Sequence, residues 1–407
     1  MPSHPAIDAL DPAGPRYATE VVDRILSEAR QAGASDVHCQ PIGEGLEIRW
    51  RVDGVLQPVA TIPSKVAANV VARLKVLADL LTYRTDVPQE GRIRVAPGAP
   101  EMRLSTFPTV LGEKAVVRMF ASAERFVRLD DLGLPDDVRE GLSRGLDETS
   151  GALVLAGPAG GGKTTTLYAA LRELAERRPG ERSLATLEDP VEAIVPGVAQ
   201  SQVNPAAGLT LEVGLRSLLR QDPEVLAIGE VRDRSTAEIA LQAALTGHLT
   251  LTTFHAGGAC EVIGRLLDMG IEPYAVRSGI RAVIAQRLVR RPCSSCSERS
   301  ERPADFLGLP VAHATIPRGC DACRGTGYLG RAVLAEILPT DPAPIGRAIL
   351  DRADVRLLEQ VAAESGMIHR WERACRAVEA GATTPAEVRR ALGVATPPAR
   401  IPIPTPA

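Results

Sequence analysis

The first part of the chain mixes helical and alternating hydrophobic spacing. Apolar residues in Ala18–Ala32 fall on one side of a helix, and Gly33 is placed to end it. Apolar and polar residues alternate over Leu46–Val52, and the Asp53-Gly54 pair that follows is typical of a tight hairpin turn. The other elements predicted here are a helix over Pro63–Leu81 and, after the PQEGRI segment (Pro88–Ile93), two strands over Met102–Phe107 and Lys114–Phe120. This mixture predicts a small α+β domain at residues 16–121, after a flexible Pro-rich arm at 1–15.

Farther along, short apolar runs alternate with helical segments. The runs predict buried strands over Leu153–Leu155, Val225–Glu230 and Leu249–His255, and one within Ser183–Glu192 that ends in Glu188 and Asp189. The helical segments are Thr165–Leu174, Gly208–Pro223, Ser235–Leu245 with Ser235 as its N-cap, and a basic helix over Arg277–Arg291. Repeated strand–helix units predict an α/β domain with a parallel sheet, which binds its ligand at the carboxyl ends of the strands.

The pattern also divides the rest of the chain. Residues 122–150 are predicted to be a linker with its own short helix, and the α/β domain is expected to span 151–392. A cysteine-containing insertion at 292–330 interrupts this domain, and short helices between Pro344 and Leu392 complete it. Residues 393–407 form a Pro-rich tail without a packing pattern.

Residues 157–164 read G-x-x-x-x-G-K-[ST], the phosphate-binding loop, between a predicted strand and a predicted helix. Its glycines allow successive backbone N–H groups to face one concavity, and the helix N-terminus adds a partial positive charge. Lys163 is expected to reach the β- and γ-phosphates of ATP, and the Thr164 hydroxyl to ligate Mg²⁺. The residues predicted to hold the nucleotide are Gly157, Pro158, Ala159, Gly160, Gly161, Gly162, Lys163, Thr164 and Thr165.

Carboxylates follow two of the predicted strands. Glu230 ends an apolar strand, where a carboxylate is expected to polarise the water that attacks ATP, although Gly229 replaces the Asp that usually precedes it. A place in an ordinary surface ion pair is the alternative for Glu230. Glu188 ends a second strand, and we expect it either to orient water or hold the water shell of the metal, or to end the strand in a turn with Asp189 and Pro190.

Histidines and arginines extend the list of candidate catalytic residues. His248 and His255 flank one predicted strand beside the nucleotide elements, although a lone histidine is more often a buried, hydrogen-bonded core residue. The candidates for a contact with the γ-phosphate are Arg103, Arg118, Arg216 and Arg220. The last two are one turn apart on the predicted helix and are expected to share a face. For any one of these arginines, a solvated or salt-bridged role stays open.

Four of the seven cysteines form two C-x-x-C pairs, and incidental cysteines are the alternative to a metal site. The pairs are Cys293 with Cys296 and Cys320 with Cys323. Four thiolates at this spacing predict a closed, structural Zn²⁺ site, because no coordination position stays open. The other three cysteines, Cys39, Cys260 and Cys375, are isolated and are expected to pack as small hydrophobic residues.

Composition adds limits on size, partners and location. The chain has 407 residues, of which 45% are hydrophobic, so two or three domains with real cores are expected. The net charge of −3 gives no overall basic field, and no nucleic-acid partner is expected. No apolar run approaches the ~20 residues of a membrane span, and the N-terminus lacks the apolar core of a signal peptide. We therefore expect a cytoplasmic protein that can still bind at a membrane face.

The order and spacing of its motifs make the chain resemble the ATPases of type II secretion and type IV pilus assembly. The matching segments lie between Ala34 and Leu338 and are ASDVHCQP, RVDG, PQEGRI, STFPTVLGEK, GPAGGGKTTTLYA, TLEDPVE, GLRSLLRQDPEVLAIGEVRDRSTAEIALQAALTGH, TTFHA, RLLDMGIEPY, AQRLVRR and GC-x-x-C-x-GTGY-x-GR. By this resemblance, LEDPVE is the Asp box of the family and TGHLTLTTFH is its His box.

The resemblance implies a homohexamer of two-domain subunits, each with a small N-terminal domain on a RecA-like ATPase domain. Nucleotide would bind between these domains, with Arg103 and Arg118 approaching from the smaller one. Turnover would change the angle between the domains and push on an inner-membrane platform protein, which adds pilin-like subunits. The chain would then lie peripherally at the inner face of the cytoplasmic membrane.

The chain departs from the family pattern in places. Members usually carry a further N-terminal domain that docks to the membrane partner, whereas only residues 1–15 precede the first predicted domain, so a cytoplasmic docking protein is a candidate partner. Cys39-Gln40 replaces a commoner apolar–acidic pair, and Ala256 follows His255 where Thr is frequent. The tetracysteine element is typical of secretion and pilus-extension members and is lacking in retraction motors.

Two functions of other classes compete with this one. The first is a nucleic-acid translocase or binding protein with a zinc ribbon, and its support is the expected basic helix Arg277–Arg291. The second is a degenerate ATPase that serves as a scaffold, which the intact Lys163, Thr164 and Glu230 disfavour.

Overall fold

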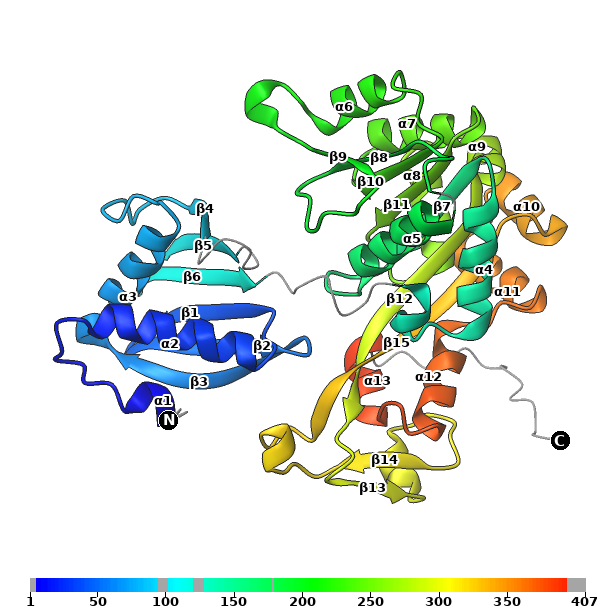
Figure 1. The fold of residues 1–407 in the computed structure, drawn as a ribbon. Coiled ribbons are helices and arrows are strands. Elements are labelled where there is room, and N and C mark those ends of the chain that lie inside the picture. Colours follow the sequence, from blue (N-terminus) through cyan, green and yellow to red (C-terminus); the bar gives the residue numbers. More distant parts are fainter. Residues whose placement is uncertain (1–4, 94–101, 120–127, 178, 394–407) are drawn as a thin grey trace. The chain divides into compact units, whose positions relative to one another are not determined.

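The computed structural model describes residues 5–93, 102–119, 128–177 and 179–393. The chain divides into two compact units, Met1–Ser122 and Ala123–Ala407, and each is described by itself (Figure 1). Several predicted segments lie outside the described residues: positions 394–407 of the expected tail, 1–4 of the expected arm, 120–121 at the end of the first domain and 122–127 of the expected linker.

The first unit is a six-stranded antiparallel sheet in the order β3-β2-β1-β6-β5-β4, with helices against one face (Figure 1). Its strands are β1 (Asp36–Ile42), β2 (Gly45–Val52), β3 (Val55–Pro63), β4 (Gln89–Ile93), β5 (Met102–Thr109) and β6 (Gly112–Met119). Its helices are α1 (Pro5–Asp8), α2 (Tyr17–Gln31) and α3 (Ser64–Leu77). The predicted α+β architecture is confirmed.

One hydrophobic core holds this unit together, because alternate residues along the strands point toward α2 and α3. In β1, for example, Val37 and Cys39 are buried, whereas His38 between them is half-buried. The segment expected to be a flexible arm contributes to the same core, since Ile7 of α1 is 2% exposed within it. In β5, Arg103 and Ser105 alternate with buried residues and project to the other face of the sheet.

The Asp53-Gly54 turn confirms the predicted hairpin. Asp53 has φ 48° and Gly54 has φ 81°, and a two-residue turn of the favoured type needs positive φ at both positions. Val52 pairs with Val55, and β2 and β3 continue as an antiparallel pair from there.

The second unit is built on a seven-stranded sheet in the order β15-β12-β7-β11-β10-β8-β9. Its strands are β7 (Gly151–Ala156), β8 (Leu184–Glu188), β9 (Ala199–Gln202), β10 (Val225–Val231), β11 (Leu249–Phe254), β12 (Ile280–Pro292) and β15 (Tyr328–Pro339). All neighbours pair in parallel except β15, which is antiparallel to β12. The predicted parallel-rich α/β sheet is confirmed.

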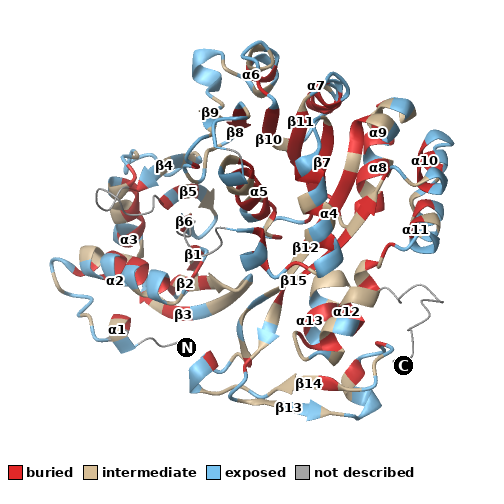
Figure 2. Cartoon of the chain, turned by 45° about the vertical axis from the view of Figure 1, so that its right-hand side comes forward, coloured by how far each residue is buried: buried red, intermediate tan, exposed pale blue. Residues whose placement is uncertain are grey.

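Helices cover both faces of this sheet, which Figure 2 shows as buried strands between half-exposed helices. The α-helices are α4 (Asp136–Asp147), α5 (Lys163–Arg177), α6 (Leu211–Leu218), α7 (Arg234–Leu245), α8 (Ala259–Asp268), α9 (Pro273–Gly279), α10 (Ala343–Leu350), α11 (Val355–Glu364), α12 (Arg370–Glu379) and α13 (Pro385–Leu392). The 3-10 turns are η2 (Leu129–Leu132), η3 (Pro205–Ala207), η4 (Pro303–Phe306) and η5 (Asp321–Cys323). In β7, Val154 faces one core and Leu153 and Leu155 face the other.

The strands β12 and β15 are long, and they continue past the rest of the sheet as a two-stranded ribbon (Figure 1). Beyond this ribbon lie the short antiparallel strands β13 (Ser297–Ser300) and β14 (Ala314–Pro317). The predicted cysteine insertion is therefore an extension of the sheet edge. Among the residues that the structure describes, no helix is both long and apolar enough to cross a bilayer.

The basic helix expected over Arg277–Arg291 is wrong, because most of this segment is the strand β12. Its apolar residues serve the two faces of the sheet alternately, with Val283 in one core and Ile284 in the other. Its arginines are also engaged: Arg290 pairs with Glu387 at 2.9 Å and stacks on a tyrosine ring. The feature that favoured a nucleic-acid function is therefore absent from this segment.

Two helix boundaries also differ from the prediction. The helix expected over Gly208–Pro223 is shorter, since α6 begins after Thr210, whose hydroxyl caps it, and ends at Leu218. The N-cap of α7 is Asp233 and not Ser235, because the Asp233 carboxylate accepts the N–H of Thr236.

Candidate nucleotide-binding site

The predicted phosphate-binding loop leaves β7 and ends where α5 begins at Lys163. Gly162 has φ 86°, a conformation that side chains rarely adopt. A Cβ atom on Gly157 would lie 2.3 Å from the carbonyl oxygen of Gln286, so only glycine fits there. The backbone of the loop thus has the glycine-dependent conformation that a phosphate cradle needs.

Lys163 lies along this loop with its side chain largely buried. Its Nζ donates to the carbonyl oxygen of Gly157 at 2.8 Å and to that of Pro158 at 3.0 Å. Burial lowers the pKa of Lys163, and the negative charge of Glu230 acts in the opposite direction. The negative charge of Glu230 therefore favours the charged form of the lysine.

Glu230 and His255 meet at the carboxyl ends of β10 and β11. Their closest atoms, Glu230 Oε1 and His255 Nε2, are 2.7 Å apart. The other carboxylate oxygen accepts from Arg232 at 2.8 Å. Because β7 pairs in parallel with β11, this pair lies at the sheet edge from which the phosphate-binding loop emerges. Residues on two separate strands, both predicted, are thus brought together.

Sequence reasoning missed Arg232. Arg232 follows the last residue of β10, two positions after Glu230, so its closeness in the sequence to the predicted carboxylate was the available signal. The arginine holds one carboxylate oxygen, and His255 lies against the other.

Glu188 ends β8 as predicted, but it is enclosed by donors. Its carboxylate accepts from the Tyr168 hydroxyl at 2.5 Å, the Thr186 hydroxyl at 2.6 Å and the Gln200 amide at 3.2 Å. Burial, together with the hydrogen bond to Glu188 and the negative charge of that carboxylate, raises the pKa of Tyr168. The Tyr168 hydroxyl in turn accepts the N–H of Glu192 at 2.8 Å. Glu188 therefore ties α5, β8 and the following turn together.

His248 is not brought to the phosphate-binding loop. It precedes β11, so it lies at the amino edge of the sheet, where its carbonyl accepts the N–H of Gly151. Its ring Nδ1 lies 3.1 Å from the carbonyl of Ala243. The strand that separates it from His255 spans six residues, which is ~20 Å of extended chain.

Arg216 and Arg220 do not share a helix face. Arg216 is on α6 and pairs with Glu212 at 3.0 Å. Arg220 follows the helix end and donates to the carbonyl of Arg216 at 2.8 Å. Both are exposed, so they stay available to a ligand.

Arg103 and Arg118 belong to the first unit, where they lie directly opposite each other on β5 and β6. Arg118 is also opposite Asp36 of β1 and pairs with it at 3.3 Å, yet its side chain is 69% exposed. Arg103 forms an ion pair with Glu90. Directly opposite residues share a face of a sheet, so the uncovered face of the first unit displays a short row of arginines.

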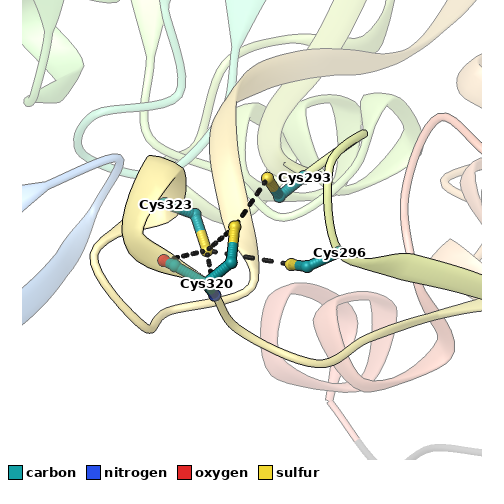
Figure 3. Close-up of side chains that lie close together, drawn as sticks. All are labelled: Cys293, Cys296, Cys320 and Cys323. Atoms are coloured by element: carbon teal, nitrogen blue, oxygen red, sulfur yellow. Dashed lines mark hydrogen bonds between the residues drawn. The ribbon is translucent and has the colours of Figure 1, made fainter.

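The four predicted metal ligands converge at the end of the β12–β15 ribbon (Figure 3). Their Sγ atoms all lie within 4.8 Å of one another. The Cys293–Cys320 and Cys296–Cys323 sulfur pairs are both separated by 3.9 Å, and Cys320 and Cys323 by 3.8 Å. A tetrahedral zinc ion with Zn–S bonds of ~2.3 Å separates its sulfurs by roughly 3.8 Å, so this cluster fits Zn²⁺.

Backbone N–H groups point at these sulfurs. Cys323 Sγ accepts from the N–H of Cys320 at 3.2 Å and of Gly327 at 3.1 Å, and Cys296 Sγ accepts from Gly319 at 3.2 Å. Desolvation opposes the thiolate of Cys323, but these donors and the neighbouring thiols outweigh it and lower its pKa to about 6. In the same cluster, desolvation together with the hydrogen bonds to Cys320 and Cys323 raises the pKa of Cys296 to about 11. The contacts therefore favour the thiolate that a metal ligand needs at Cys323 and not at Cys296.

The isolated cysteines Cys39, Cys260 and Cys375 are all buried, as expected. Burial raises the pKa of Cys39 to about 12, which is the behaviour of an inert core thiol.

The fold and the loop define the class of protein. A seven-stranded, parallel-rich sheet with a phosphate-binding loop after β7 is a RecA-like P-loop ATPase domain, and this one carries a tetracysteine extension. A model of the family described as "Type II/IV secretion system protein" matches residues 13–390. The chain therefore belongs to the Type II/IV secretion system protein family.

Named relatives in this family serve pili and secretion. The chain is 38% identical over 360 residues to the type IV pilus assembly ATPase PilB of Thermus thermophilus, which covers 86% of this chain and 40% of that protein. It is 42% identical over 329 residues to type II secretion system protein E of Pseudomonas aeruginosa, covering 79% and 65%. With the protein transport protein HofB homolog of Escherichia coli, identity is 39% over 381 residues, covering 92% and 81%. The chain thus spans less than two thirds of the length of the Thermus thermophilus and Pseudomonas aeruginosa relatives.

Solved structures share the fold. The ATPase DotB of Legionella pneumophila aligns with a TM-score of 0.66 at 23% identity, covering 92% of this chain and 95% of that one. The pilus retraction motor PilT with bound ADP aligns with a TM-score of 0.60 at 22% identity, covering 92% and 97%. At these identities the likeness concerns the fold alone.

Proposed function

We propose that this chain is a motor that hydrolyses Mg²⁺-ATP to assemble a type II secretion pseudopilus or a type IV pilus. The observation that carries the proposal is the phosphate-binding loop with Lys163 at the same sheet edge as the Glu230–His255 pair. A phosphate cradle and a placed carboxylate are the two parts that ATP hydrolysis needs in one domain. Membership of the family supports the biological role, since relatives are named as ATPases of these machines.

The nucleotide is held by backbone N–H groups within Gly157–Thr165, although Pro158 has none and those of Gly157 and Gly161 donate to the carbonyls of Phe254 and Pro158. Lys163 exchanges its carbonyl partners for phosphate oxygens. Thr164 supplies a hydroxyl ligand for Mg²⁺, an ion that neutralises charge on the phosphoryl oxygens when it is bound.

Glu230 polarises the attacking water. Arg232 donates to one carboxylate oxygen at 2.8 Å, and His255 Nε2 lies 2.7 Å from the other oxygen, so two side chains adjoin the carboxylate. His255 is half-exposed and orients the carboxylate, which makes it a positioning residue in this scheme. Glu188 supports the site from behind by fixing the end of β8.

Arg103 and Arg118 supply positive charge for the transferred phosphoryl group when the small domain closes on the nucleotide. Support comes from their side-by-side position on the uncovered face of the first sheet and from the exposure of Arg118. Arg216 and Arg220 are the arginines of the ATPase domain available for the same task. Closure would complete the site and deliver the movement in one step, and a homohexameric ring would pass it on.

The movement acts on an inner-membrane platform protein that adds pilin-like subunits, with a cytoplasmic docking protein as a second candidate partner. The motor itself works in the cytoplasm at the inner face of the membrane. The four cysteine sulfurs would hold a Zn²⁺ ion that stabilises the end of the β12–β15 ribbon, and the ion would be structural because its four coordination positions would all be cysteine sulfurs.

The test is ATP hydrolysis by the purified chain as its concentration is raised, with the assembly state followed by light scattering. We expect activity that stops when Mg²⁺ is chelated and whose specific value rises as hexamers form. In cells, deletion of the gene should abolish surface pili or the secreted proteins. Full specific activity in monomers at every concentration would contradict a ring motor, and no activity in hexamers would contradict an ATPase.

A further inference from the structure

A glutamine outside the phosphate-binding loop is hydrogen-bonded to the loop and to the helix after it. Gln286 lies on β12 beside β7, one position after the pair formed by Ala285 and Ala156. Its side chain is 2% exposed. The amide Nε2 donates to the carbonyl oxygen of Gly161 at 2.9 Å, and Oε1 accepts from the Thr166 hydroxyl at 2.9 Å. One side chain thus bridges the loop and the first turn of α5.

The bond to Gly161 determines the direction of the next N–H group. In a planar trans peptide the C=O of one residue and the N–H of the next point in opposite directions. By holding the carbonyl of Gly161, Gln286 directs the N–H of Gly162 away from β12. A loop that binds phosphate through its N–H groups depends on such orientations.

The backbone of Gln286 also lies against the loop. A Cβ atom on Gly157 would be 2.3 Å from the carbonyl oxygen of Gln286, and one on Gly161 would be 3.2 Å from it. A Cβ atom on Gly162 would be 3.0 Å from the Gln286 side-chain nitrogen. Three loop glycines therefore permit a close approach to this strand, in addition to any approach to a ligand.

We propose that Gln286 is a positioning residue for the nucleotide site. Its amide bridge between Gly161 and Thr166 holds the loop in the nucleotide-accepting conformation before the nucleotide arrives. A loop ordered in advance loses less conformational entropy on binding, so the bridge contributes to affinity without touching the ligand. The inference rests on the proposed function, because it requires that this loop binds a nucleoside triphosphate.

Three variants and one control separate this role from a merely structural one. Gln286→Met keeps the length of the side chain and removes both hydrogen bonds. Thr166→Val removes the hydroxyl at the other end of the bridge with little change in volume, whereas Thr166→Ser keeps the hydroxyl. The control is Thr250→Val on β11, a fully buried threonine whose hydroxyl has no hydrogen-bond partner among the described residues.

The full-length variants are compared for the dissociation constants of ATP and ADP, for kcat and KM, and for the midpoint of thermal unfolding. We expect Gln286→Met to weaken nucleotide binding about tenfold, with KM rising in parallel and kcat within about twofold of wild type. Thr166→Val should weaken binding about fivefold, and Thr166→Ser should restore it. Because the bridge acts as one unit, the double variant should bind about as weakly as Gln286→Met alone.

Unchanged dissociation constants in Gln286→Met or Thr166→Val, whether or not the unfolding midpoint falls, would overturn the inference. So would equal losses in Thr166→Val and the Thr250→Val control. If Gln286→Met does not fold, the Thr166 pair decides alone. A separate result, equal nucleotide binding by the wild-type chain and Lys163→Ala, would overturn the proposed function and leave nothing for Gln286 to position.

Discussion

The two sheets of this protein are covered differently, and the difference decides where each one displays its polar side chains. The sheet of the first unit has helices on one face, so alternate residues project from the other, as Arg103 and Arg118 do. The sheet of the second unit is covered on both faces, and every residue of β7, β8 and β11 is buried. Its polar groups therefore gather where strands end, as Glu230 and His255 do.

The comparison teaches how each kind of sheet brings distant residues together. On the first sheet, strand register places Arg118 between Arg103 and Asp36. In the second, parallel pairing aligns the carboxyl ends of β7, β10 and β11, and loops from those ends meet at one edge. Side chains and loops at the ends of parallel strands can lie around a phosphate on several sides. Side chains on the face of a sheet can contact it from one side only.

The largest effect is expected at the strand-end edge, from Lys163→Ala. Removing the positive charge that contacts the phosphates should lower ATP turnover by about 10³-fold or more, measured as phosphate release. The exposed Lys65 on α3 is the matched control, and Lys65→Ala should hydrolyse ATP like wild type. Wild-type turnover in Lys163→Ala would mean that this edge is not the phosphate site.

The second effect at this edge separates binding from chemistry. Glu230→Gln keeps the shape of the side chain and removes the charge that polarises water, so turnover should fall about 10²-fold or more while ATP affinity is kept. Glu238→Gln on α7, where Glu238 forms only a surface ion pair, is the control for a lost carboxylate. Loss of ATP binding in Glu230→Gln would assign Glu230 a structural role instead.

The third prediction concerns the face of the first sheet. Arg118→Ala should leave ATP affinity within about twofold of wild type and lower turnover about tenfold to hundredfold. This loss is smaller than the one expected from removing a single arginine finger, because Arg103 lies beside Arg118 and keeps a positive charge there. Arg49→Ala changes an arginine of the same sheet that pairs with Glu47, and it should be neutral. Equal turnover in Arg118→Ala and wild type would remove the first sheet from the catalytic scheme.

The tetracysteine element belongs to neither covered sheet, so its loss should spare both. Cys320→Ser should lower the zinc content from one ion per chain to none in elemental analysis and loosen the ribbon end, because four-cysteine coordination is needed for tight binding. The main thermal transition should stay within a few degrees. Ser294→Ala in the same segment should keep its zinc. A wild-type chain without zinc, with all four thiols titratable, would refute the site.

The smallest effect is expected from pH, at the helix that packs on β12. Glu387 on α13 is fully buried; burial alone would raise its pKa, but bonds from Arg390 and Arg290 outweigh burial and lower it below the ordinary 4.5. The Glu387 carboxylate is therefore protonated more readily in the unfolded chain than in the folded one. The contribution of Glu387 to the stability of the fold is complete above pH 4.5, and it is lost as the pH falls through the lower pKa of the folded state.

Glu387→Gln should therefore be less stable than wild type at pH 7 and should lose less stability on acidification, measured by urea unfolding at a series of pH values. Glu364→Gln, an exposed change on α11, should follow the wild-type profile. Parallel profiles for wild type and Glu387→Gln would show that another carboxylate governs acid stability.

Local sequence signals predicted much of the fold because they depend on contacts within a few residues. The helix expected over Ala18–Ala32 is α2, the Asp53-Gly54 hairpin forms, and the phosphate-binding loop lies between β7 and α5. The pairing of the C-x-x-C motifs was also readable, because the chemistry of four thiolates at that spacing allows few alternatives.

The clearest failed prediction is one in which distant packing overrides local preference. Arg277–Arg291 reads as a basic helix, but its apolar residues are buried in two cores on opposite faces of the sheet, which only a strand allows. The helix after Gly208 is cut short, so Arg220 falls beyond its end. His248 and His255 flank one strand, and the strand itself separates them.

The sequence by itself determined which residues are candidates for chemistry, since Lys163, Glu230, His255 and the four cysteines are marked by residue type and local spacing. Only the tertiary structure decided their partners. Gln286 and Gly161 are 125 positions apart, and they meet because β12 pairs beside β7 and not elsewhere in the sheet. The order of strands in the sheet depends on burial of both sheet faces and on loop closure. Neither produces a periodic pattern in the amino-acid sequence of the strands.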